Sequence, residues 1–347
     1  MTESVAPLRV HVISETAHIA KETGVHTAFV DCVNLLRDSP DFEVIVNGEG
    51  WGDVLHSHTY GPYFLWKGLR YRGRRVFTAH VIPDSARGSF PLWRLLLPAI
   101  RWYLRGIYSY ADVCVAVSPV VADSIRALGA KTEVIEIFSF VDEDRFHPSA
   151  ELRAAGRKRL SVPEDAFVVL GVGTIEGRKG VEDFIDVAQA CPEALFVWVG
   201  GRPFGAMTEG IARINRRIRK ATENVRFAGL FDLEEMPLAY NAADLFLFPS
   251  LQENCPVAPL EAAACGLPVI YKDIPEYRQL YRLPYLRARD TAEFTALTRR
   301  MIQDRAYFEE GHRISRELLG QFSKGAVRAQ LLDLYREVHA LSARQTS

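Results

Sequence analysis

Short apolar runs of six to eight residues recur along the chain, rich in Val, Ile, Leu and Phe. They lie at 8–15, 42–48, 53–59, 75–81, 113–118, 132–138, 167–173, 194–201, 225–230, 245–250 and 268–273. Helical stretches separate them, and after about residue 290 only helical stretches remain. Near-continuous apolar strands that alternate with helices predict parallel sheets covered on both faces.

The pattern occurs in two similar halves, and 347 residues are too many for one ordinary core. We expect a first domain over 1–148, a second over 149–322, and a closing helix over 323–347 that crosses back to the first. The polar segment 142–165 lacks a buried strand, so we expect the hinge there. The predicted fold is two Rossmann-like, doubly wound α/β domains that face each other, with ligands bound in the cleft at the strands' carboxyl ends.

Composition narrows the class of protein. The formal net charge is −1, which argues against a general nucleic-acid binder. Five cysteines are scattered without a CxxC pair, so we interpret them as small core residues in a reducing cytosol rather than disulfides or zinc ligands. No signal peptide opens the chain, and Arg94, Pro98 and Arg101 interrupt the longest apolar run. We therefore expect a soluble or peripheral protein.

The stretch "GVGTIEGRKGVEDFI" ends a predicted strand and begins a helix. Gly171 to Gly173 close the strand, Arg178 and Lys179 lie in the loop, and Gly180 opens the helix. Cations beside a helix N-terminus favour anions. The spacing matches neither a P-loop nor a dinucleotide fingerprint. Taken alone, the loop indicates either an anion site or two solvated cations in a turn.

The stretch "PSLQENCPVAPLEAAACGLPVI" places two acids eight positions apart. Glu253 falls in the loop after a strand, and Glu261 lies about one turn inside a helix that Gly266 ends. Alanines follow Glu261, and a carboxylate in such apolar company needs a partner. Glu261 could accept the two hydroxyls of a ribose and Glu253 could hold a sugar. The alternative, one solvated helical Glu and one turn Glu, is equally compatible with the spacing.

These motifs resemble the retaining glycosyltransferases of family 4, which have the GT-B fold. The resemblance covers nearly the whole chain. It includes the E-x7-E pair with "EAAACGLPVI", the upstream "VRFAGL…LEEMPLAYNAADLFLFPS", the Lys179-Gly180 step, and "DVLHSHT" with "VFTAH" in the first half. It favours the functional interpretation of both stretches and implies a metal-independent hexosyltransferase (EC 2.4.1-type) with no cofactor, acting on a nucleoside-diphosphate sugar.

The resemblance also implies roles for particular residues. Glu261 is expected to bind the ribose and Glu253 to face the donor hexose, while Lys179 with Arg178 holds the diphosphate. His80 resembles the histidine near sugar and acceptor. Further donor contacts are expected from the backbone of the two domains, at Gly24, Gly173, Asn254, Cys255, Pro256 and Val257.

The chain departs from the family at three places. Thr174 stands where an arginine often follows the first loop glycine, "NCP" (254–256) replaces Gly-Phe-Gly, and Ser139-Phe140 replaces Asn-Gly. Arg178 is a candidate substitute for the missing arginine. A degenerate subunit that binds a nucleotide sugar without transfer is therefore one alternative. The base and the hexose, whether UDP-glucose, UDP-galactose or GDP-mannose, stay open.

Two weaker signals have structural explanations. Asp142 and Asp144 formally match a D-x-D metal motif, but they lie in the expected hinge, where we interpret them as structural. His56 and His58 lie on one predicted strand, and we expect them to point to opposite faces and not to share a site.

Basic and aromatic residues gather in residues 61–110. The window holds nine Lys or Arg, one acid (Asp84) and Trp66, Trp93 and Trp102, so its charge is +8. This mixture is typical of interfacial helices and resembles bacterial diacylglycerol and glycolipid glycosyltransferases. We expect a lipid acceptor and an anionic membrane surface as partners, no obligate protein partner, and a peripheral location on the inner face of the cell membrane. Alternatively, this segment is an ordinary amphipathic helix packed on its own sheet. The acceptor would then be a soluble or polyprenyl-linked glycan.

Overall fold

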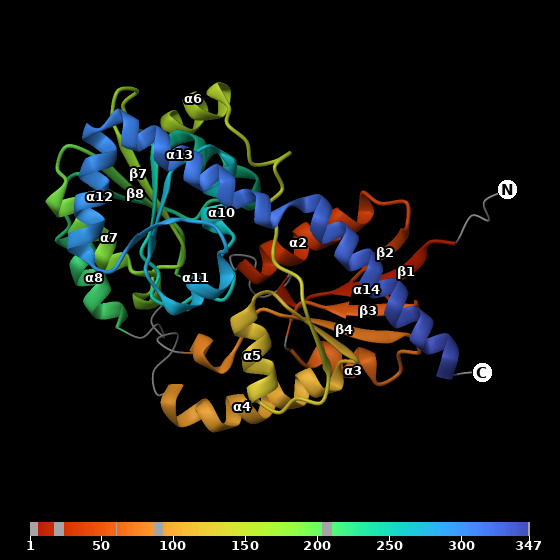
Figure 1. The fold of residues 1–347 in the computed structure, drawn as a ribbon. Coiled ribbons are helices and arrows are strands. Elements are labelled where there is room, and N and C mark those ends of the chain that lie inside the picture. Colours follow the sequence, from red (N-terminus) through yellow and green to blue (C-terminus); the bar gives the residue numbers. More distant parts are fainter. Residues whose placement is uncertain (1–5, 17–23, 60, 87–92, 203–209, 346–347) are drawn as a thin grey trace. The chain divides into compact units, whose positions relative to one another are not determined.

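All eleven predicted strands form, and each lies in one of two six-stranded parallel sheets. A computed structural model of the chain describes residues 6–16, 24–59, 61–86, 93–202 and 210–345 (Figure 1). Two units divide it: Met1–Asp84, Leu95–Ser139 and Lys324–Ser347 form the first, and Ser85–Arg94 and Phe140–Ser323 form the second. The prediction of an α/β fold with two parallel sheets is thus confirmed.

The first unit has the strand order β2-β1-β3-β4-β5-β6. Its strands are β1 (Leu8–Ile13), β2 (Phe42–Val46), β3 (Val54–Ser57), β4 (Arg74–Ala79), β5 (Val113–Ala116) and β6 (Glu133–Glu136). The helices around this sheet are α2 (Gly24–Arg37), α3 (Pro62–Gly68), α4 (Trp93–Tyr110), α5 (Pro119–Ala127) and α14 (Lys324–Gln345), with the 3₁₀ turn η1 (Pro83–Ala86) (Figure 1).

A buried hydrogen-bond chain attaches the C-terminal helix α14 to the first sheet. The Tyr335 hydroxyl lies 2.6 Å from Nδ1 of His56, and Nε2 of the same ring lies 2.6 Å from the Thr78 hydroxyl on the next strand. Tyr335 and His56 are fully buried. Because each polar atom has a partner, the chain can lie in the core without the cost of unpaired groups.

The second unit has the strand order β12-β11-β10-β7-β8-β9. Its strands are β7 (Val168–Val172), β8 (Leu195–Val199), β9 (Val225–Gly229), β10 (Leu245–Phe248), β11 (Val269–Lys272) and β12 (Leu286–Ala288). The helices are α6 (Ala150–Arg159), α7 (Val181–Ala190), α8 (Ile211–Arg219), α9 (Met236–Ala242), α10 (Ala258–Ala264), α11 (Pro275–Leu280), α12 (Thr291–Gln303) and α13 (Arg305–Leu319), with 3₁₀ turns η2 (Gly177–Lys179), η4 (Leu233–Glu235) and η5 (Gly320–Phe322).

The second sheet reverses its direction of growth between two central strands. From β7 the chain adds β8 and β9 on one side, then returns to place β10 on the other side of β7. The pairs Leu245↔Val169 and Phe246↔Leu170 fix the register. The loops that follow β7 and β10 therefore leave the same edge of the sheet on either side of a topological switch point, where such folds bind ligands.

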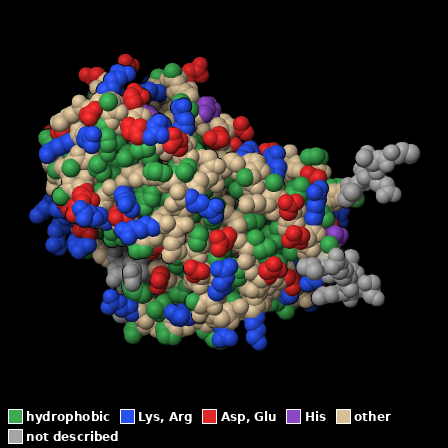
Figure 2. All heavy atoms as spheres, viewed as in Figure 1, with side chains coloured by type: hydrophobic (Ala, Val, Ile, Leu, Met, Phe, Trp, Pro, Cys, Tyr) green, Lys and Arg blue, Asp and Glu red, His purple; other side chains and the backbone are tan. Residues whose placement is uncertain are grey.

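Aromatic side chains fill the core on one face of this sheet. The Phe184 ring packs edge-on against Trp198 and Phe196, with ring centroids 5.1 and 5.3 Å apart. All three are buried, and Phe294 of α12 joins the same cluster. Figure 2 shows the outer surface of the protein, where charged side chains of both signs lie on the face in view.

The polar segment 142–165 contains a helix that the apolar pattern did not reveal. Ser149 caps α6, its hydroxyl accepting the N–H of Leu152 at 3.2 Å. Arg157 of α6 is buried and donates to Asp244 at 2.9 Å, while Arg153 donates to the other oxygen of that carboxylate at 2.6 Å. Asp244 also accepts the N–H of Val168, at 2.8 Å. One carboxylate thus joins α6 to the edges of β7 and β10.

No helix in the described part of the chain combines the length and the apolar character needed to span a bilayer. Helix α4, the longest apolar run in the sequence, continues through Pro98 and carries arginines along its length.

Asp244→Ala is expected to destabilise the second unit by about 3 kcal/mol, because it leaves the buried Arg157 guanidinium without its counter-charge. Urea unfolding followed by tryptophan fluorescence, which includes the buried Trp198, measures the change. The matched control is Arg305→Ala, whose ion pair with Glu309 is 3.7 Å long and exposed on both sides; it should leave the midpoint nearly unchanged. Equal effects of the two substitutions would contradict this assignment.

Candidate functional site

The loops after β7 and β10 touch each other beside the switch point of the second sheet. Leu251 N donates to the Arg178 carbonyl at 2.8 Å. Gly180 makes this approach possible: its φ is +72°, and a Cβ there would lie 2.2 Å from the Pro249 carbonyl oxygen. Only glycine fits a position that combines left-handed backbone with such close contact. The two motifs singled out in the sequence are therefore one structural site.

An ion pair crosses the switch point between the two loops. Lys179 Nζ lies 2.5 Å from Oε1 of Glu253, and the Ser250 hydroxyl donates to the same oxygen at 2.6 Å. Arg178 approaches that oxygen to 3.8 Å. Burial alone would raise the pKa of Glu253, but the charges of Lys179 and Arg178 and the two hydrogen bonds outweigh it, so the pKa is lowered. Glu253 is therefore an ionised, buried carboxylate at neutral pH.

A second acid, Glu176, holds Arg178 in place. One Glu176 oxygen accepts from Arg178 at 2.8 Å and from the Thr174 hydroxyl at 2.8 Å. Arg178 also donates to the Gln252 carbonyl at 3.0 Å. Burial tends to lower the pKa of Arg178, but Glu253 and Glu176 more than compensate and raise it. Thr174 and Arg178 thus meet on one carboxylate, so Arg178 reaches the part of the loop where Thr174 replaces the family arginine.

Gly173 at the end of β7 has φ +153°, and its carbonyl accepts the indole N–H of Trp198 at 2.9 Å. A Cβ at Gly173 would lie 3.3 Å from the Lys179 side chain. The glycine therefore leaves room for the Lys179 stem to lie across the end of the strand.

Glu261 lies in α10 as the sequence predicts, and it is buried, with one hydrogen-bond partner for its carboxylate among the described residues. The Tyr240 hydroxyl of α9 donates to Glu261 Oε2 at 2.5 Å. Burial raises the pKa of Glu261, and the Tyr240 bond and the charge of Arg145 oppose this only in part. Ala262, Ala263 and Ala264 are buried, so Glu261 lies in the apolar company that the sequence indicates.

Residues 254–257, between Glu253 and the start of α10, lie in a short loop. Gln252 donates to the Asn254 side chain at 3.0 Å, Pro256 is buried, and Cys255 and Val257 are half-buried. The Val257 carbonyl accepts the N–H of Glu261 at 2.9 Å, which closes the first turn of α10.

In the first unit, His80 follows β4 and contacts His58, which follows β3. His58 Nδ1 lies 3.2 Å from His80 Nε2 and the rings stack with centroids 5.4 Å apart. Burial lowers the pKa of His80 to about 4, and burial, with His56 and His80 nearby, lowers the pKa of His58 as well. Both rings are therefore neutral at pH 7.

The prediction that His56 and His58 point to opposite faces is wrong. Residues two apart on a strand share a face, and these two rings lie 4.6 Å apart. Within the described residues, they also form with Cys32 a group whose possible metal-ligand atoms lie within 4.8 Å of one another. Both His56 nitrogens are already in hydrogen bonds, and burial raises the pKa of Cys32 to about 12, which disfavours a thiolate. We assign no metal to this group.

Gly24 begins α2, after a segment that lies outside the described residues. A Cβ at Gly24 would meet no atom within 4 Å, so packing inside the protein does not require glycine there. Nearby, the Glu15 carboxylate after β1 accepts the N–H of Tyr63 at 3.1 Å.

Four of the five cysteines are buried, as expected of core residues, and Cys255 is half-buried. Asp142 accepts the N–H of Asp144 at 3.3 Å within a turn.

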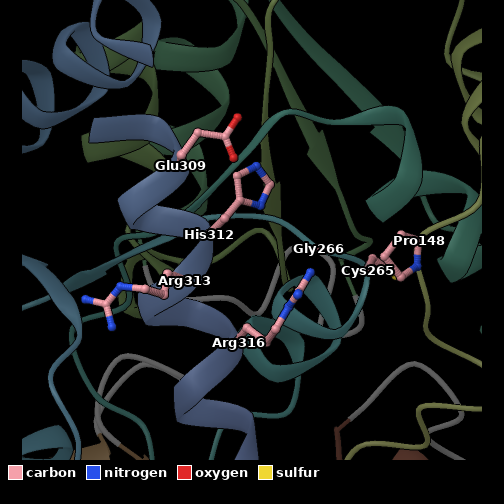
Figure 3. A pocket seen from close by; sticks show the side chains of 7 residues that line it. All are labelled: Pro148, Cys265, Gly266, Glu309, His312, Arg313 and Arg316. Atoms are coloured by element: carbon pink, nitrogen blue, oxygen red, sulfur yellow. The ribbon is translucent and has the colours of Figure 1, made fainter. Parts of the chain in front are cut away.

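The second unit also has a pocket of about 450 Å³ away from these residues (Figure 3). It is lined by Pro148, Cys265, Gly266, Glu309, His312, Arg313 and Arg316. Figure 3 shows His312 and Arg316 extending from α13 towards the turn at Gly266, which follows the C-terminal end of α10. None of the predicted site residues lines it, and Arg313 is neutralised by Glu310 and Glu317, each at 2.5 Å.

Sequence reasoning missed three residues of these sites: Glu176, Tyr240 and His58. Glu176 lies two positions before Arg178, and an acid beside two cations in a glycine loop is a usable signal. The sequence carries no such signal for Tyr240, because this residue is 21 positions away from Glu261 and the two meet only in the folded protein. The second-unit site contains two cations, Lys179 and Arg178, and two acids whose pKa values are shifted in opposite directions: that of Glu253 is lowered and that of Glu261 is raised. This arrangement suits a ligand in which an anion is attached to a polyhydroxyl group.

Two segments match known families. Residues 41–145 match the family described as Glycosyltransferase Family 4, and residues 166–304 match Glycosyl transferases group 1. An alpha-galactosylglucosyldiacylglycerol synthase of Streptococcus pneumoniae is 32% identical over 277 residues, covering 78% of this chain and 74% of the relative. A processive diacylglycerol alpha-glucosyltransferase of Acholeplasma laidlawii is 26% identical over 314 residues (88% and 92%). A D-inositol 3-phosphate glycosyltransferase of Geodermatophilus obscurus is 31% identical over 285 residues (76% and 62%).

Solved structures agree in fold. A sucrose-phosphate synthase from Thermosynechococcus elongatus superimposes with a TM-score of 0.79 at 18% identity, covering 96% of this chain and all of its own. Anabaena HepE, solved with UDP and glucose, gives 0.74 at 16% identity, covering 94% and 99%. These similarities support the prediction of a GT-B fold, and the named enzymes among the relatives support that of a hexosyltransferase. With both halves matched and a relative at 32% identity over most of its length, the chain belongs to glycosyltransferase family 4.

Proposed function

We propose that the protein transfers a hexosyl group from a nucleoside-diphosphate sugar, with retention, to a hydroxyl of a membrane lipid such as diacylglycerol or a glycosyl-diacylglycerol. One observation carries the donor half of this proposal: Lys179 and Arg178 meet Glu253 at the switch point of the second sheet. Two relatives are named for transfer to diacylglycerol-type lipids with alpha linkage. An alpha product from an alpha-linked nucleotide sugar is a transfer with retention.

The donor would lie along the edge where β7 and β10 end. Lys179 and Arg178 would hold the diphosphate, Glu261 the ribose hydroxyls, and Glu253 the hexose. The backbone of Gly173 and of 254–257 would border it. In this role Arg178 substitutes for the arginine missing at Thr174, since both side chains bond the same Glu176 oxygen.

Transfer forms a bond between the acceptor hydroxyl oxygen and the anomeric carbon and breaks the bond from that carbon to the diphosphate oxygen, which keeps the bonding electron pair. The proton of the acceptor hydroxyl passes to the leaving diphosphate. Negative charge grows on the leaving diphosphate and positive charge on the sugar ring. Cations fixed before the reaction stabilise the first without reorganisation. An ionised Glu253 beside the hexose would favour the second, and its lowered pKa keeps it charged.

The first unit would supply His80 and the backbone at Gly24. Since the pKa of His80 is lowered to about 4, the ring would act as a neutral hydrogen-bonding group rather than a cation. Charge on the leaving group would then be met by Lys179 and Arg178 alone among the predicted residues.

The lipid acceptor is supported by an unusual helix in the first half of the chain. The first eleven residues of α4, 93–103, contain no buried side chain. Trp102 is 78% exposed and Leu95 74%. In α3, whose Phe64 ring packs edge-on against Tyr110 at the end of α4, Trp66 is 67% exposed. A helix packed on its own sheet would bury these side chains, so the exposed apolar face fits a membrane surface better.

Five of the nine cations counted in this window are exposed: Arg70, Arg72, Arg94, Arg101 and Arg105. Arg74 and Arg75 pair with Asp112, Lys67 donates to the Gly48 carbonyl, and Arg87 lies outside the described residues. In Figure 2 the lower edge of the molecule, over α4, carries basic and apolar side chains together. Fewer cations are therefore exposed than the sequence window contains, but the exposed ones still suit an anionic surface. We propose that this surface is the cytoplasmic side of the membrane.

A soluble acceptor is the second candidate, favoured by the relative named as a D-inositol 3-phosphate glycosyltransferase. A degenerate donor-binding subunit is the third, and the substitution at Thr174 and the "NCP" loop are the observations behind it.

The proposed function is tested with purified protein, UDP-glucose, UDP-galactose or GDP-mannose, and vesicles containing diacylglycerol or a glucosyl-diacylglycerol. Nucleoside diphosphate release that depends on the lipid, together with a glycolipid product, is expected, and we expect both to persist in EDTA. Lys179→Ala should slow turnover on the order of 10²–10³-fold. Release with soluble acceptors only would favour the second candidate, and no release from any donor would favour the third.

Glu253→Gln is expected to change binding and turnover in opposite directions. The substitution keeps the side chain's size but frees Lys179 and removes a negative charge that faces the diphosphate. Affinity for UDP, or for GDP if UDP does not bind, should rise about tenfold, while transfer slows because the hexose loses its acid. Titration calorimetry and steady-state rates measure the two. Ser250→Ala, which keeps the charge of Glu253, is the matched control. A Glu253→Gln protein that binds UDP as weakly as Lys179→Ala would contradict the proposal that Lys179, once free of Glu253, binds the diphosphate.

Arg101→Glu/Arg105→Glu should weaken binding to anionic vesicles by at least about 30-fold, because each cation near such a surface contributes about 1 kcal/mol. Co-sedimentation with vesicles of rising anionic content, at low and high salt, measures it. Arg305→Glu on the exposed face of α13 makes the same charge change elsewhere and should have little effect. Binding that ignores lipid charge and salt would contradict a membrane-facing α4.

A further inference from the structure

We propose that Tyr240 is a positioning residue that aims the Glu261 carboxylate at the donor's ribose and keeps it in the acceptor form. The inference rests on the proposed role of Glu261 and adds a residue to it. Tyr240 lies on α9, away from both loops that carry the sequence motifs, and in this role it would touch no part of the donor.

The geometry separates the two oxygens of Glu261. Oε2 accepts the Tyr240 hydroxyl at 2.5 Å, and Oε1 has no hydrogen-bond donor among the described residues. A carboxylate offers about four lone-pair sites on its two oxygens. The Tyr240 bond anchors Oε2 and leaves Oε1 for hydroxyl groups of a ligand. This differs from a carboxylate that rotates freely and meets a ribose with either oxygen.

Tyr240 is itself held rigidly. Its ring packs edge-on against Phe146, with centroids 5.8 Å apart, and lies tilted against Phe246 of β10, also at 5.8 Å. The side chain is fully buried. Because the ring is packed against two phenylalanines, its hydroxyl oxygen has a fixed position, and the core thereby determines where Glu261 Oε2 lies.

The surroundings of Glu261 explain why this donor matters. Two groups shift its pKa: Tyr240 from α9 and Arg145, which precedes α6. Cys265, after the end of α10, also lies close enough for the charge of Glu261 to raise the pKa of its thiol. Arg145 acts only through its charge, since no ion pair joins it to Glu261 within the described residues. Burial raises the pKa of Glu261 and the Tyr240 hydrogen bond is the larger of the two opposing effects.

The sign of the pH effect follows. Without the Tyr240 hydroxyl, the pKa of Glu261 rises further, so protonation begins at a higher pH. A protonated carboxyl has lost an acceptor site, and a ribose hydroxyl then finds a poorer partner. Donor binding that depends on ionised Glu261 should therefore weaken as pH falls, and should do so at higher pH in the variant than in the unchanged protein.

Tyr240→Phe tests this, because phenylalanine keeps the ring between Phe146 and Phe246 and removes only the hydroxyl. The probe is UDP, or GDP if UDP does not bind, titrated by calorimetry from pH 5.5 to 8. At pH 8 we expect the variant to bind roughly threefold to tenfold more weakly, and the deficit to grow as the pH falls. The same titration with the 2′,3′-dideoxy nucleotide should show little difference between variant and unchanged protein.

Tyr271→Phe is the matched control: it removes another buried hydroxyl from the same unit, on β11, and should change neither affinity nor its pH dependence. Thermal unfolding of both variants detects a general loss of stability, which would weaken binding of ribose and dideoxyribose nucleotides alike.

Glu261→Gln separates this inference from the function beneath it. If Glu261→Gln leaves nucleotide affinity unchanged, the ribose role of Glu261 fails. If Glu261→Gln weakens binding but Tyr240→Phe shows neither a pH-dependent deficit nor discrimination between the two sugars, the ribose role stands and the positioning role of Tyr240 is overturned.

Discussion

The contact between Lys179 and Glu253 is the interaction on which the second-unit site depends. It joins two loops that are 74 residues apart in sequence, and it forms only because β7 and β10 are neighbours in the sheet. Gly180 allows the loops to touch. If the strand order or that glycine changed, the same side chains would point into solvent as separate charges. The strand order of the sheet thus brings two separate loops together into one charged site.

Burial of acids is the common theme around this contact, and each acid has a different partner. Glu253 has cations, so it stays ionised. Glu261 has a tyrosine hydroxyl and a more distant arginine, which offset its burial only in part, so its pKa stays raised. Asp244 has two arginines and a backbone N–H, and it serves the fold. An unpaired carboxylate in any of these places would cost several kcal/mol, and the choice of partner determines whether the acid supports structure or binding.

Much of the fold was predictable, because parallel strands buried on both faces leave a continuous apolar signal. β12 was missed because Leu286–Ala288 is only three residues long and includes Arg287. α6 was missed because its outer face is polar. The E-x7-E acids and the Arg178-Lys179 pair were found from local spacing and family resemblance. Tyr240 and His58 were not, because their roles arise from contacts between separate strands and helices. The prediction for His56 and His58 was wrong because residues two apart on a strand lie on the same face of the sheet, and it placed them on opposite faces.

The bond between His56 and Tyr335 has a consequence for biosynthesis. It spans 279 positions, so the first unit, although its strands leave the ribosome first, lacks a buried wall of its core until the last helix is made. The second unit draws nearly all of its residues from one continuous stretch, Phe140–Ser323, and can close earlier. Contacts between residues so far apart in sequence form slowly, and the apolar surface that they cover stays exposed until they form. On the growing chain, the half that is synthesised first is therefore the half that is completed last.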